Sequence, residues 1–234
     1  MQIRRKMVNW LSFPKDMLVL LESLVSHLFK ESQDLRPDLV RLFFAEHYDK
    51  PDPTVRDGSD LRYLSQCLPL LDEEILTKKE VIDLCSGALS FYRLLISNDI
   101  DFHRYTAIDF SWHGEIPSEV NFFHKSVIDF RYNCSKICTL FSSNGFCYLH
   151  TLNDVHCLQD VPPSSKLILI EPYPSIYWNQ NFNGITPVYR TPEELAEELS
   201  VIGWVAEKTI VYQVLPWFQR FGLPLSYTTR FKKL

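Results

Sequence analysis

The sequence predicts a doubly wound α/β domain with a mostly parallel sheet, preceded by an N-terminal helical cap. Short apolar runs alternate with helical segments along most of the chain, and these runs lack the polar alternation of strands that have one face in water. A polar loop over residues 49–59, with two prolines and a glycine, separates them from the helical N-terminal part. Uniformly apolar strands that alternate with helices are typical of a parallel sheet with both faces covered.

The N-terminal part has the pattern of two amphipathic helices. Apolar residues recur at steps of three and four from Lys15 to about His47, with a break near Pro37. We therefore divide the chain of 234 residues into a cap and loop, residues 1–60, and an α/β domain, residues 61–234. The cap is expected to close over the site and to shape substrate choice.

Seven strands and four helices are expected in the α/β domain. The strands are Glu80–Leu84, Tyr105–Ile108, Val120–Phe123, Ile137–Phe141, Lys166–Ile170, Lys208–Val214 and Tyr227–Phe231, and the helices are Leu61–Leu71, Leu89–Ser97, Cys147–Gln159 and Pro192–Ile202. Thr191 is placed to cap the last helix and Gly203 to end it. The two strands after Gly203 are expected to pair as an antiparallel hairpin at the edge of the sheet.

Charge and composition exclude several classes of partner. Lys and Arg number 24 against 29 Asp and Glu, for a net charge of −5, whereas nucleic-acid binding depends on clustered cations. Apolar stretches are too short to span a membrane. The six cysteines form no CxxC pair, so we expect no metal site and free thiols in a reducing compartment. The sequence thus predicts a cytoplasmic protein that binds neither nucleic acid nor membrane.

Acidic residues end the first two predicted strands of the domain. Asp83 is followed by a turn of small residues, which lets a ligand approach the backbone, and then by a helix with unpaired N–H groups. Asp109 stands where a carboxylate can accept hydrogen bonds from both ribose hydroxyls of an adenosine-bearing cofactor. The residues predicted to bind a cofactor here are Asp83, Cys85, Ser86, Gly87, Asp109 and Phe110, with Phe110 placed to flank the adenine.

The later strand ends add further candidates. Asp129 and Phe130 follow the third strand, and Asp129 is suited to the exocyclic amine of adenine. Asn144 directly follows the fourth strand, Tyr148 lies just beyond it, and Tyr173 follows the fifth. Because ligands of open α/β sheets bind beyond the carboxyl ends of the strands, these three are the predicted catalytic or substrate-contacting residues.

This series of strand ends resembles the class I S-adenosylmethionine-dependent methyltransferases over about residues 80–234. In that family the first strand ends in an acid and a glycine-rich turn, the second in the ribose-binding acid, and the third in an acid that faces adenine. The resemblance implies a Rossmann-like, seven-stranded sheet with an antiparallel last strand, and S-adenosylmethionine as cofactor.

The turn departs from the family pattern. Where the family usually has three spaced glycines, this chain has Cys85, Gly87 and Leu89, so only the middle glycine is kept. The turn is also similar to the Ser-Gly-x-Leu turn of nicotianamine-synthase-like enzymes, which transfer the aminocarboxypropyl group of the same cofactor.

Three functions follow from this resemblance. The first is methyl transfer to a small molecule, in which the protein mainly aligns the reacting atoms. The second is attack at the γ-carbon of the methionine moiety, by an acceptor or by the cofactor's own amine to give azetidine-2-carboxylate, with release of methylthioadenosine. The third is a non-catalytic binding protein with a methyltransferase-like fold. The acceptor and the oligomeric state are left open.

Overall fold

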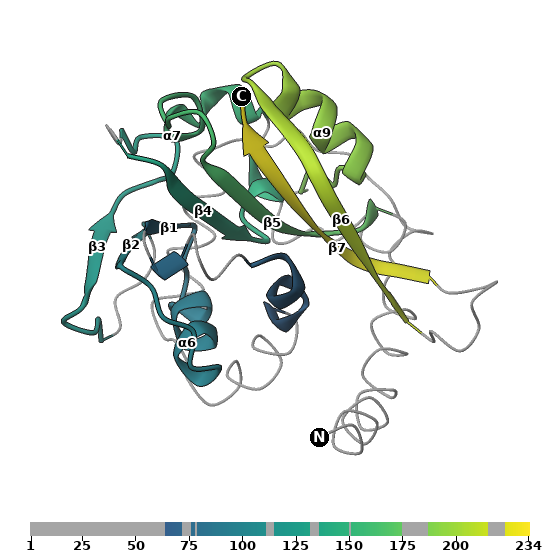
Figure 1. The fold of residues 1–234 in the computed structure, drawn as a ribbon. Coiled ribbons are helices and arrows are strands. Elements are labelled where there is room, and N and C mark those ends of the chain that lie inside the picture. The colour runs from purple at the N-terminus through teal and green to yellow at the C-terminus, as the bar shows by residue number, and fades with distance from the viewer. Residues whose placement is uncertain are drawn as a thin grey trace.

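The computed structural model describes residues 64–71, 76–77, 79–110, 115–131, 136–149, 151–174, 187–214 and 223–234. The predicted cap, residues 1–60, and Cys134 lie outside these residues. The described part is built around one twisted sheet with helices on both sides (Figure 1).

The sheet has seven strands in the order β3-β2-β1-β4-β5-β7-β6. Their bounds are β1 Glu80–Leu84, β2 Arg104–Asp109, β3 Val120–His124, β4 Cys138–Ser143, β5 Lys166–Pro172, β6 Trp204–Val214 and β7 Leu223–Lys233. All seven strands lie where the sequence predicted them, with β6 and β7 longer than expected. The doubly wound, mostly parallel sheet is therefore confirmed.

The first five strands are parallel and β7 runs antiparallel to them. β1 pairs with both β2 and β4, so the strand order reverses between β1 and β4, and a ligand site is expected at this switch point. β7 pairs antiparallel with β5 and with β6, which confirms the expected hairpin of the last two strands.

One face of the sheet is covered by α6 (Ser90–Ser97) and the 3₁₀ helix η1 (Ser65–Leu70). Their buried side chains form one cluster with alternate residues of the strands, among them Val81, Tyr105 and Phe141. Phe91 of α6 stacks on Phe141, with ring centroids 3.6 Å apart. The predicted helix over residues 61–71 is a 3₁₀ helix in its described part, and it contains Pro69, which has no N–H to donate.

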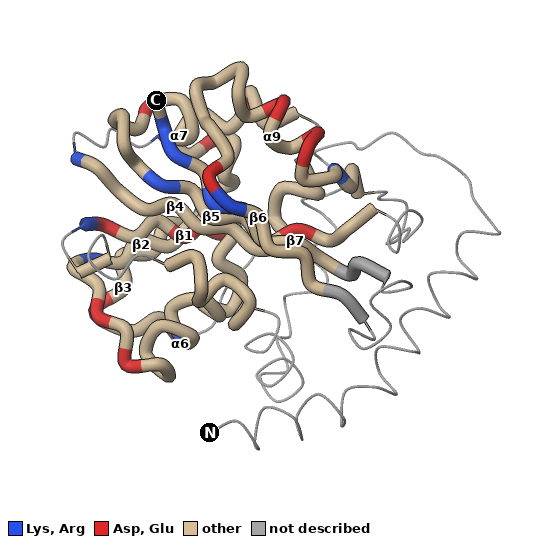
Figure 2. Tube along the Cα trace, turned by 45° about the vertical axis from the view of Figure 1, so that its right-hand side comes forward, with Lys and Arg blue, Asp and Glu red and all other residues tan. Residues whose placement is uncertain are grey.

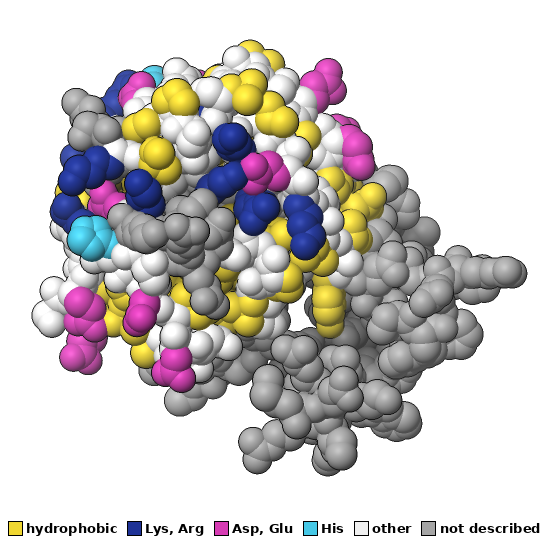
Figure 3. Space-filling view, in the orientation of Figure 1, with side chains coloured by type: hydrophobic (Ala, Val, Ile, Leu, Met, Phe, Trp, Pro, Cys, Tyr) yellow, Lys and Arg dark blue, Asp and Glu magenta, His cyan; other side chains and the backbone are white. Residues whose placement is uncertain are grey.

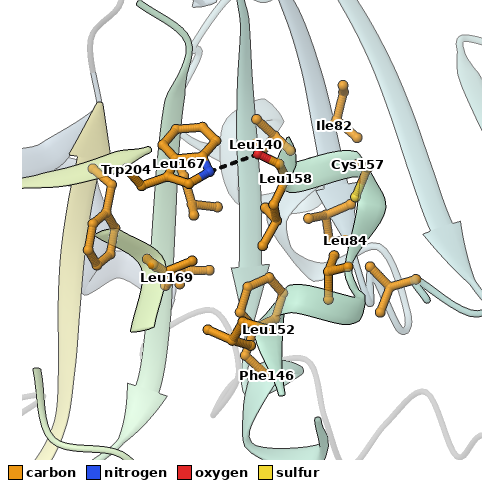
Figure 4. Close-up of a cluster of buried hydrophobic side chains, with 14 of the residues drawn as sticks. Ile82, Leu84, Leu140, Phe146, Leu152, Cys157, Leu158, Leu167, Leu169 and Trp204 are labelled. Atoms are coloured by element: carbon orange, nitrogen blue, oxygen red, sulfur yellow. Dashed lines mark hydrogen bonds between the residues drawn. The ribbon is translucent and has the colours of Figure 1, made fainter. Parts of the chain in front are cut away.

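The opposite face carries α9 (Pro192–Ser200), α7 (His156–Gln159) and two short 3₁₀ helices. Ile82 and Leu84 point to this face, into a cluster that Leu158 and Trp204 complete (Figure 4). The indole Nε1 of Trp204 donates to the carbonyl of Leu158 at 2.9 Å, so the largest buried side chain also has its polar atom satisfied.

α9 begins as predicted. The Thr191 side chain accepts a hydrogen bond from the Glu194 amide, and the Glu194 carboxylate accepts one from the Thr191 amide, which is a complete capping box. Gly203 follows the helix with a φ of 82°, in the left-handed region that favours glycine.

The helix predicted over residues 147–159 is wrong in its first half. The structure has η2 (Phe146–Tyr148), η3 (Leu152–Asp154) and then α7. A continuous helix would use the carbonyls of Phe146, Cys147 and Leu149 internally. Here the carbonyls of Phe146 and Leu149 accept hydrogen bonds from the Arg190 guanidinium. The carbonyl of Cys147 accepts one from the Val188 amide.

Charged residues gather where β5, β7 and β6 lie side by side (Figure 2). The strand register places four cations on the face that η1 covers in part, and Glu207 bonds two of them, Lys166 at 2.6 Å and Arg230 at 2.9 Å. The four cations are Lys166, Lys208, Arg230 and Lys232. Figure 3 shows Lys and Arg side chains grouped around an acidic one on this side of the molecule. Exposed pairs of this kind add little stability.

None of the helices that the structure describes combines the length and the apolar character needed to cross a bilayer.

Candidate cofactor site at the carboxyl ends of β1, β2 and β4

Asp83 is a buried carboxyl in β1, on the face that carries α6. It is 2% exposed, and its Oδ2 accepts a hydrogen bond from Tyr105 Oη at 2.6 Å. Burial raises the pKa of Asp83 to about 8, although the bond from Tyr105 favours the charged form. The nearby Asp109 carboxyl also raises the pKa of Asp83. The raised pKa favours the uncharged form of Asp83 at neutral pH.

The turn after β1 keeps a left-handed backbone at three alternate positions. The φ angle is 59° at Cys85, 50° at Gly87 and 58° at Leu89. These are the three positions where the resemblance places glycines, so the backbone keeps a glycine-like path through two residues with side chains. A left-handed residue with a Cβ costs roughly 1–2 kcal/mol, and such strain is often found at ligand sites.

Asp109 ends β2 and reaches back to this turn. The Gly87 amide donates to Asp109 Oδ2 at 2.8 Å, and the Ser86 amide donates to the Ile108 carbonyl at 3.0 Å. Asp109 is 8% exposed. The two bonds fix the turn against the tip of β2, so the acid predicted to bind ribose lies beside the turn predicted to meet the rest of the cofactor.

The end of β4 packs closely against the same turn. A Cβ at Gly145 would stand 2.6 Å from Cys85 Cβ and 2.7 Å from Ser142 Oγ, both too short for any real contact. Gly145 is therefore required by its neighbours. The segment after β4, which carries Asn144 and Tyr148, is held directly against the turn after β1.

Glu171, near the end of β5, holds the segment after β4 from the other side. Its two carboxylate oxygens accept from the amides of Phe146 and Cys147, each at 3.1 Å. Burial raises the pKa of Glu171 to about 7, and these amides and Arg190 oppose that change. Because both oxygens bond to backbone amides, Glu171 fixes the position of the segment after β4.

Arg190 completes the support of this segment. Its guanidinium donates to the carbonyls of Phe146 at 3.2 Å and Leu149 at 3.0 Å, and its Nε to Glu198 of α9 at 2.5 Å. The Tyr227 hydroxyl of β7 donates to the Arg190 carbonyl at 2.9 Å. A planar guanidinium suits this role because it offers several donors in fixed directions.

The predicted catalytic residues all lie near the carboxyl ends of β4 and β5. Asn144 is exposed, has a φ of 54°, and its amide bonds to the Ile170 carbonyl at 2.9 Å. Tyr148 ends η2 and is half-buried. Tyr173 follows β5, with its ring edge-on to that of Tyr227. Their contact with a substrate stays a prediction.

The remaining predicted cofactor contacts differ in exposure. Phe110 follows Asp109 and is half-buried, whereas Asp129 is exposed, in a turn closed by a bond from its amide to the Ser126 carbonyl at 3.0 Å. Phe130 is buried in the core with its ring centroid 5.3 Å from that of Phe123. The structure thus places Phe110 and Asp129 where a ligand can reach them more readily than Phe130.

Two buried hydroxyls at this edge have no hydrogen-bond partner among the residues that the structure describes. They are Ser86 Oγ, in the turn after β1, and Ser142 Oγ, near the end of β4. Unpaired buried polar atoms are costly, and they commonly mark a position that a ligand or water fills. No described atom lies within 4 Å of the point where a Cβ of Gly87 would stand. The turn therefore offers open space and one unsatisfied hydroxyl, with a second nearby at the end of β4, which fits a polar cofactor.

Within the described ranges, no three His, Cys, Asp or Glu side chains could hold a metal ion together. The five cysteines that the structure describes form no disulfide. The absence of a metal in the working protein stays a prediction.

Sequence reasoning missed Tyr105, Glu171 and Arg190 as parts of the site. Each bonds to a residue more than 20 positions away in the chain. Tyr105 bonds to Asp83, and both Glu171 and Arg190 bond to the backbone of Phe146. One signal was available, because Glu171 comes directly after the apolar run of β5, as Asp109 does in β2.

This strand order, with acids at the tips of β1 and β2 beside a turn that opens into a helix, is that of the class I S-adenosylmethionine-dependent methyltransferase fold. Solved structures support this statement. A protein from Haloferax volcanii described as a methyltransferase, in complex with the Trm112 methyltransferase activator, superposes with a TM-score of 0.65 at 13% identity, covering 81% of this chain and 97% of that one.

Two further structures agree. An S-adenosylmethionine-dependent methyltransferase from Mesorhizobium loti gives a TM-score of 0.60 at 11% identity, over 76% of this chain and 99% of that one. A Thermotoga maritima protein, described as a possible histamine N-methyltransferase, gives a TM-score of 0.57 at 12% identity, over 82% of this chain and 100% of that one. No protein-family model and no curated protein matches the sequence. At these identities the likeness shows the fold.

Proposed function

We propose that the chain is an S-adenosylmethionine-dependent methyltransferase that acts on a small molecule. The observation that carries the proposal is the bond from the Gly87 amide to Asp109, beside the switch point of a methyltransferase fold. The unpaired hydroxyl of Ser86 in the same turn supports a polar ligand there. The γ-carbon reaction and the non-catalytic alternative have no comparable support.

The cofactor's adenosine would be held by groups from β1, β2 and β3. Asp109 would accept hydrogen bonds from the ribose hydroxyls, the amides of the turn would face the rest of the cofactor, and Phe110 and Asp129 would contact the adenine. When bound, S-adenosylmethionine supplies a methyl carbon on a positively charged sulfur. The protein's own contribution is to orient that carbon toward an acceptor and to exclude water.

The acceptor would lie over the ends of β4 and β5, beside Asn144, Tyr148 and Tyr173. Alignment of the reacting atoms alone can supply roughly 7–11 kcal/mol of a barrier, so a strong base is not required. Glu171 and Arg190 would act indirectly, because they fix the segment that carries Asn144 and Tyr148. The predicted cap, residues 1–60, would close the site and select the acceptor.

Two observations support a small acceptor, and a third supports a reducing compartment. The net charge of −5 disfavours a nucleic-acid substrate. One structural neighbour is described as a possible histamine N-methyltransferase. The five described cysteines are free, which suits the cytoplasm.

The test is to incubate the purified chain with S-adenosylmethionine, with and without cell extract, and to identify the nucleoside products by mass spectrometry. The proposal predicts S-adenosylhomocysteine with extract, and much less from Asp109→Ala than from the control Asp101→Asn, which changes an exposed acid outside the site. Methylthioadenosine would favour the γ-carbon reaction instead. Neither product, with no binding of the cofactor, would favour a non-catalytic protein.

A further inference from the structure

Cys85 and Gly145, which face each other across the site, have the reverse of the residue types that their backbones favour. Cys85 has a φ of 59°, where the backbone favours glycine, yet it carries a side chain. Gly145 has a φ of −88° and a ψ of −36°, in the right-handed region that residues with side chains adopt freely. The backbone at position 145 therefore does not require glycine, and the requirement comes from the side chain that faces it.

The contact between these two residues leaves no room for a second side chain. A Cβ at Gly145 would stand 2.6 Å from Cys85 Cβ and 2.8 Å from Cys85 Sγ. Sγ can rotate away, but Cβ is fixed to the backbone, so only a movement of one segment can relieve the shorter distance. Ser142 Oγ, 2.7 Å from the same point, has no hydrogen-bond partner among the described residues and loses none when it rotates. Cys85 and Gly145 thus set how closely the two segments approach.

The segment after β4 is held by two other parts of the chain. The Asn144 amide donates to a carbonyl of β5, and Glu171 of β5 accepts from the two amides that follow Gly145. Arg190, which precedes α9, donates to two carbonyls of the same segment. A movement of this segment would disturb all of these hydrogen bonds, so the segment resists displacement.

The turn after β1 has fewer anchors among the described residues. The amides of Ser86 and Gly87 bond it to another element, and both bonds go to the end of β2. One of the two is the bond from Gly87 to Asp109, on which the proposed ribose site depends. A methyl group added between the two segments will therefore move the turn, and the bond between Gly87 and Asp109 will be disturbed with it.

We propose that Gly145 is a positioning residue for the cofactor: it leaves room for the side chain of Cys85, so the turn stays where Gly87 meets Asp109. Positions 85 and 145 form a reciprocal pair, in which one side must lack a side chain. Side chains at both positions displace the turn and weaken cofactor binding. The inference rests on the proposed function, and it adds a reason why this chain can carry Cys85 where the resemblance places a glycine.

The test is titration calorimetry of the full chain with S-adenosylmethionine, on the wild type, Gly145→Ala, Cys85→Gly and the variant with both substitutions. Circular dichroism first establishes the temperature at which each protein is folded. Gly145→Ala should lower the affinity at least about fivefold in the wild-type background, and less than about twofold in the Cys85→Gly background. The amide NMR signal of Gly87 in the ligand-free protein should shift in Gly145→Ala, and shift less when Cys85→Gly is also present.

Val161→Ala is the matched control for a loss of stability alone. Val161 is buried in the core cluster against which Cys85 packs, but it precedes β5, at the opposite edge of the sheet. Its truncation should leave the affinity for S-adenosylmethionine unchanged. Ser142→Ala provides a milder background, because it removes the Oγ at 2.7 Å and leaves Cys85 as the clashing residue. The same comparison in this background serves if Gly145→Ala alone does not fold.

The outcomes are distinct. Wild-type affinity in folded Gly145→Ala, an equal loss with and without Cys85→Gly, or an equal loss in Val161→Ala would overturn the inference and leave the proposed function standing. If Gly145→Ala is unfolded in both backgrounds, recovery of the fold and of binding by Cys85→Gly would support the reciprocal pair, and a failure to recover would overturn it. No binding of S-adenosylmethionine by the wild type would overturn the proposed function and the inference with it.

Discussion

The amide of Gly87 donates a hydrogen bond to the carboxylate of Asp109, 22 residues later in the chain, at 2.8 Å. This bond orients the carboxylate before any ligand arrives, and a preoriented acceptor loses less entropy on binding. In the proposed function, this bond makes ribose recognition by Asp109 depend on the shape of the turn.

Asp109→Asn should therefore weaken recognition of the ribose while the turn stays intact. The new amide oxygen can still accept from Gly87, but it has lost the charge and one acceptor oxygen. The wild type should bind S-adenosylhomocysteine about tenfold or more tightly than its 2′-deoxy analogue, since a hydrogen bond to a charged group is worth about 1.5–3 kcal/mol. Calorimetry with both ligands should find this preference reduced in the variant. An undiminished preference would remove Asp109 from the ribose site.

Gly145→Ala should destabilise the fold. The added methyl would stand 2.6 Å from Cys85 Cβ, so the β1 and β4 segments must move apart, at a cost of about 1–3 kcal/mol. Urea denaturation measures the loss. In a Cys85→Gly background the same substitution should cost less, because one of the clashing side chains is gone. Equal costs in both backgrounds would contradict the close packing of these two segments.

The backbone at Leu89 can be tested by comparing two truncations. Leu89 is 2% exposed, so Leu89→Ala and Leu89→Gly both lose its core packing. They differ in backbone preference, and at a φ of 58° glycine is favoured by roughly 1 kcal/mol, the reverse of the order in a helix. Leu89→Gly should thus be the more stable variant in urea denaturation. If Leu89→Ala is more stable, Leu89 does not adopt the left-handed conformation.

Glu171 should make stability depend on pH. Its pKa rises from 4.5 to about 7 on folding, so the folded protein holds an extra proton between these values. The contribution of Glu171 is complete below about pH 4.5, and it is lost as pH rises through about 7. Glu171→Gln cannot ionise, so its free energy of unfolding relative to the wild type should be higher at pH 8 than at pH 5. A constant difference would show that the carboxyl stays charged throughout.

The sheet was predictable because its strands are short, apolar and separated by clear turns. β1 has the predicted bounds, and Asp83 and Asp109 fall at strand ends where local sequence alone puts them. The helix cap at Thr191 was predictable for the same reason, since all its hydrogen bonds join residues within three positions of each other.

What the sequence did not predict depends on contacts between distant segments. Nothing near residue 147 indicates that Arg190 will take the carbonyls a helix would need. The left-handed backbone at Cys85 and Leu89 was hidden as well, because neither residue is one that favours it. Glu171 was visible as an acid after a strand, but its role depends on amides 24 and 25 residues away.

The central claim is that S-adenosylmethionine binds where the turn after β1 meets the tip of β2. Amide NMR of the full chain during titration with S-adenosylmethionine tests this most directly, because Gly87 lies in the turn and its amide bonds to Asp109. The account predicts saturable shifts that are largest at residues 83–89 and 109–110. Shifts confined to other parts of the chain, or none at saturating ligand, would contradict it.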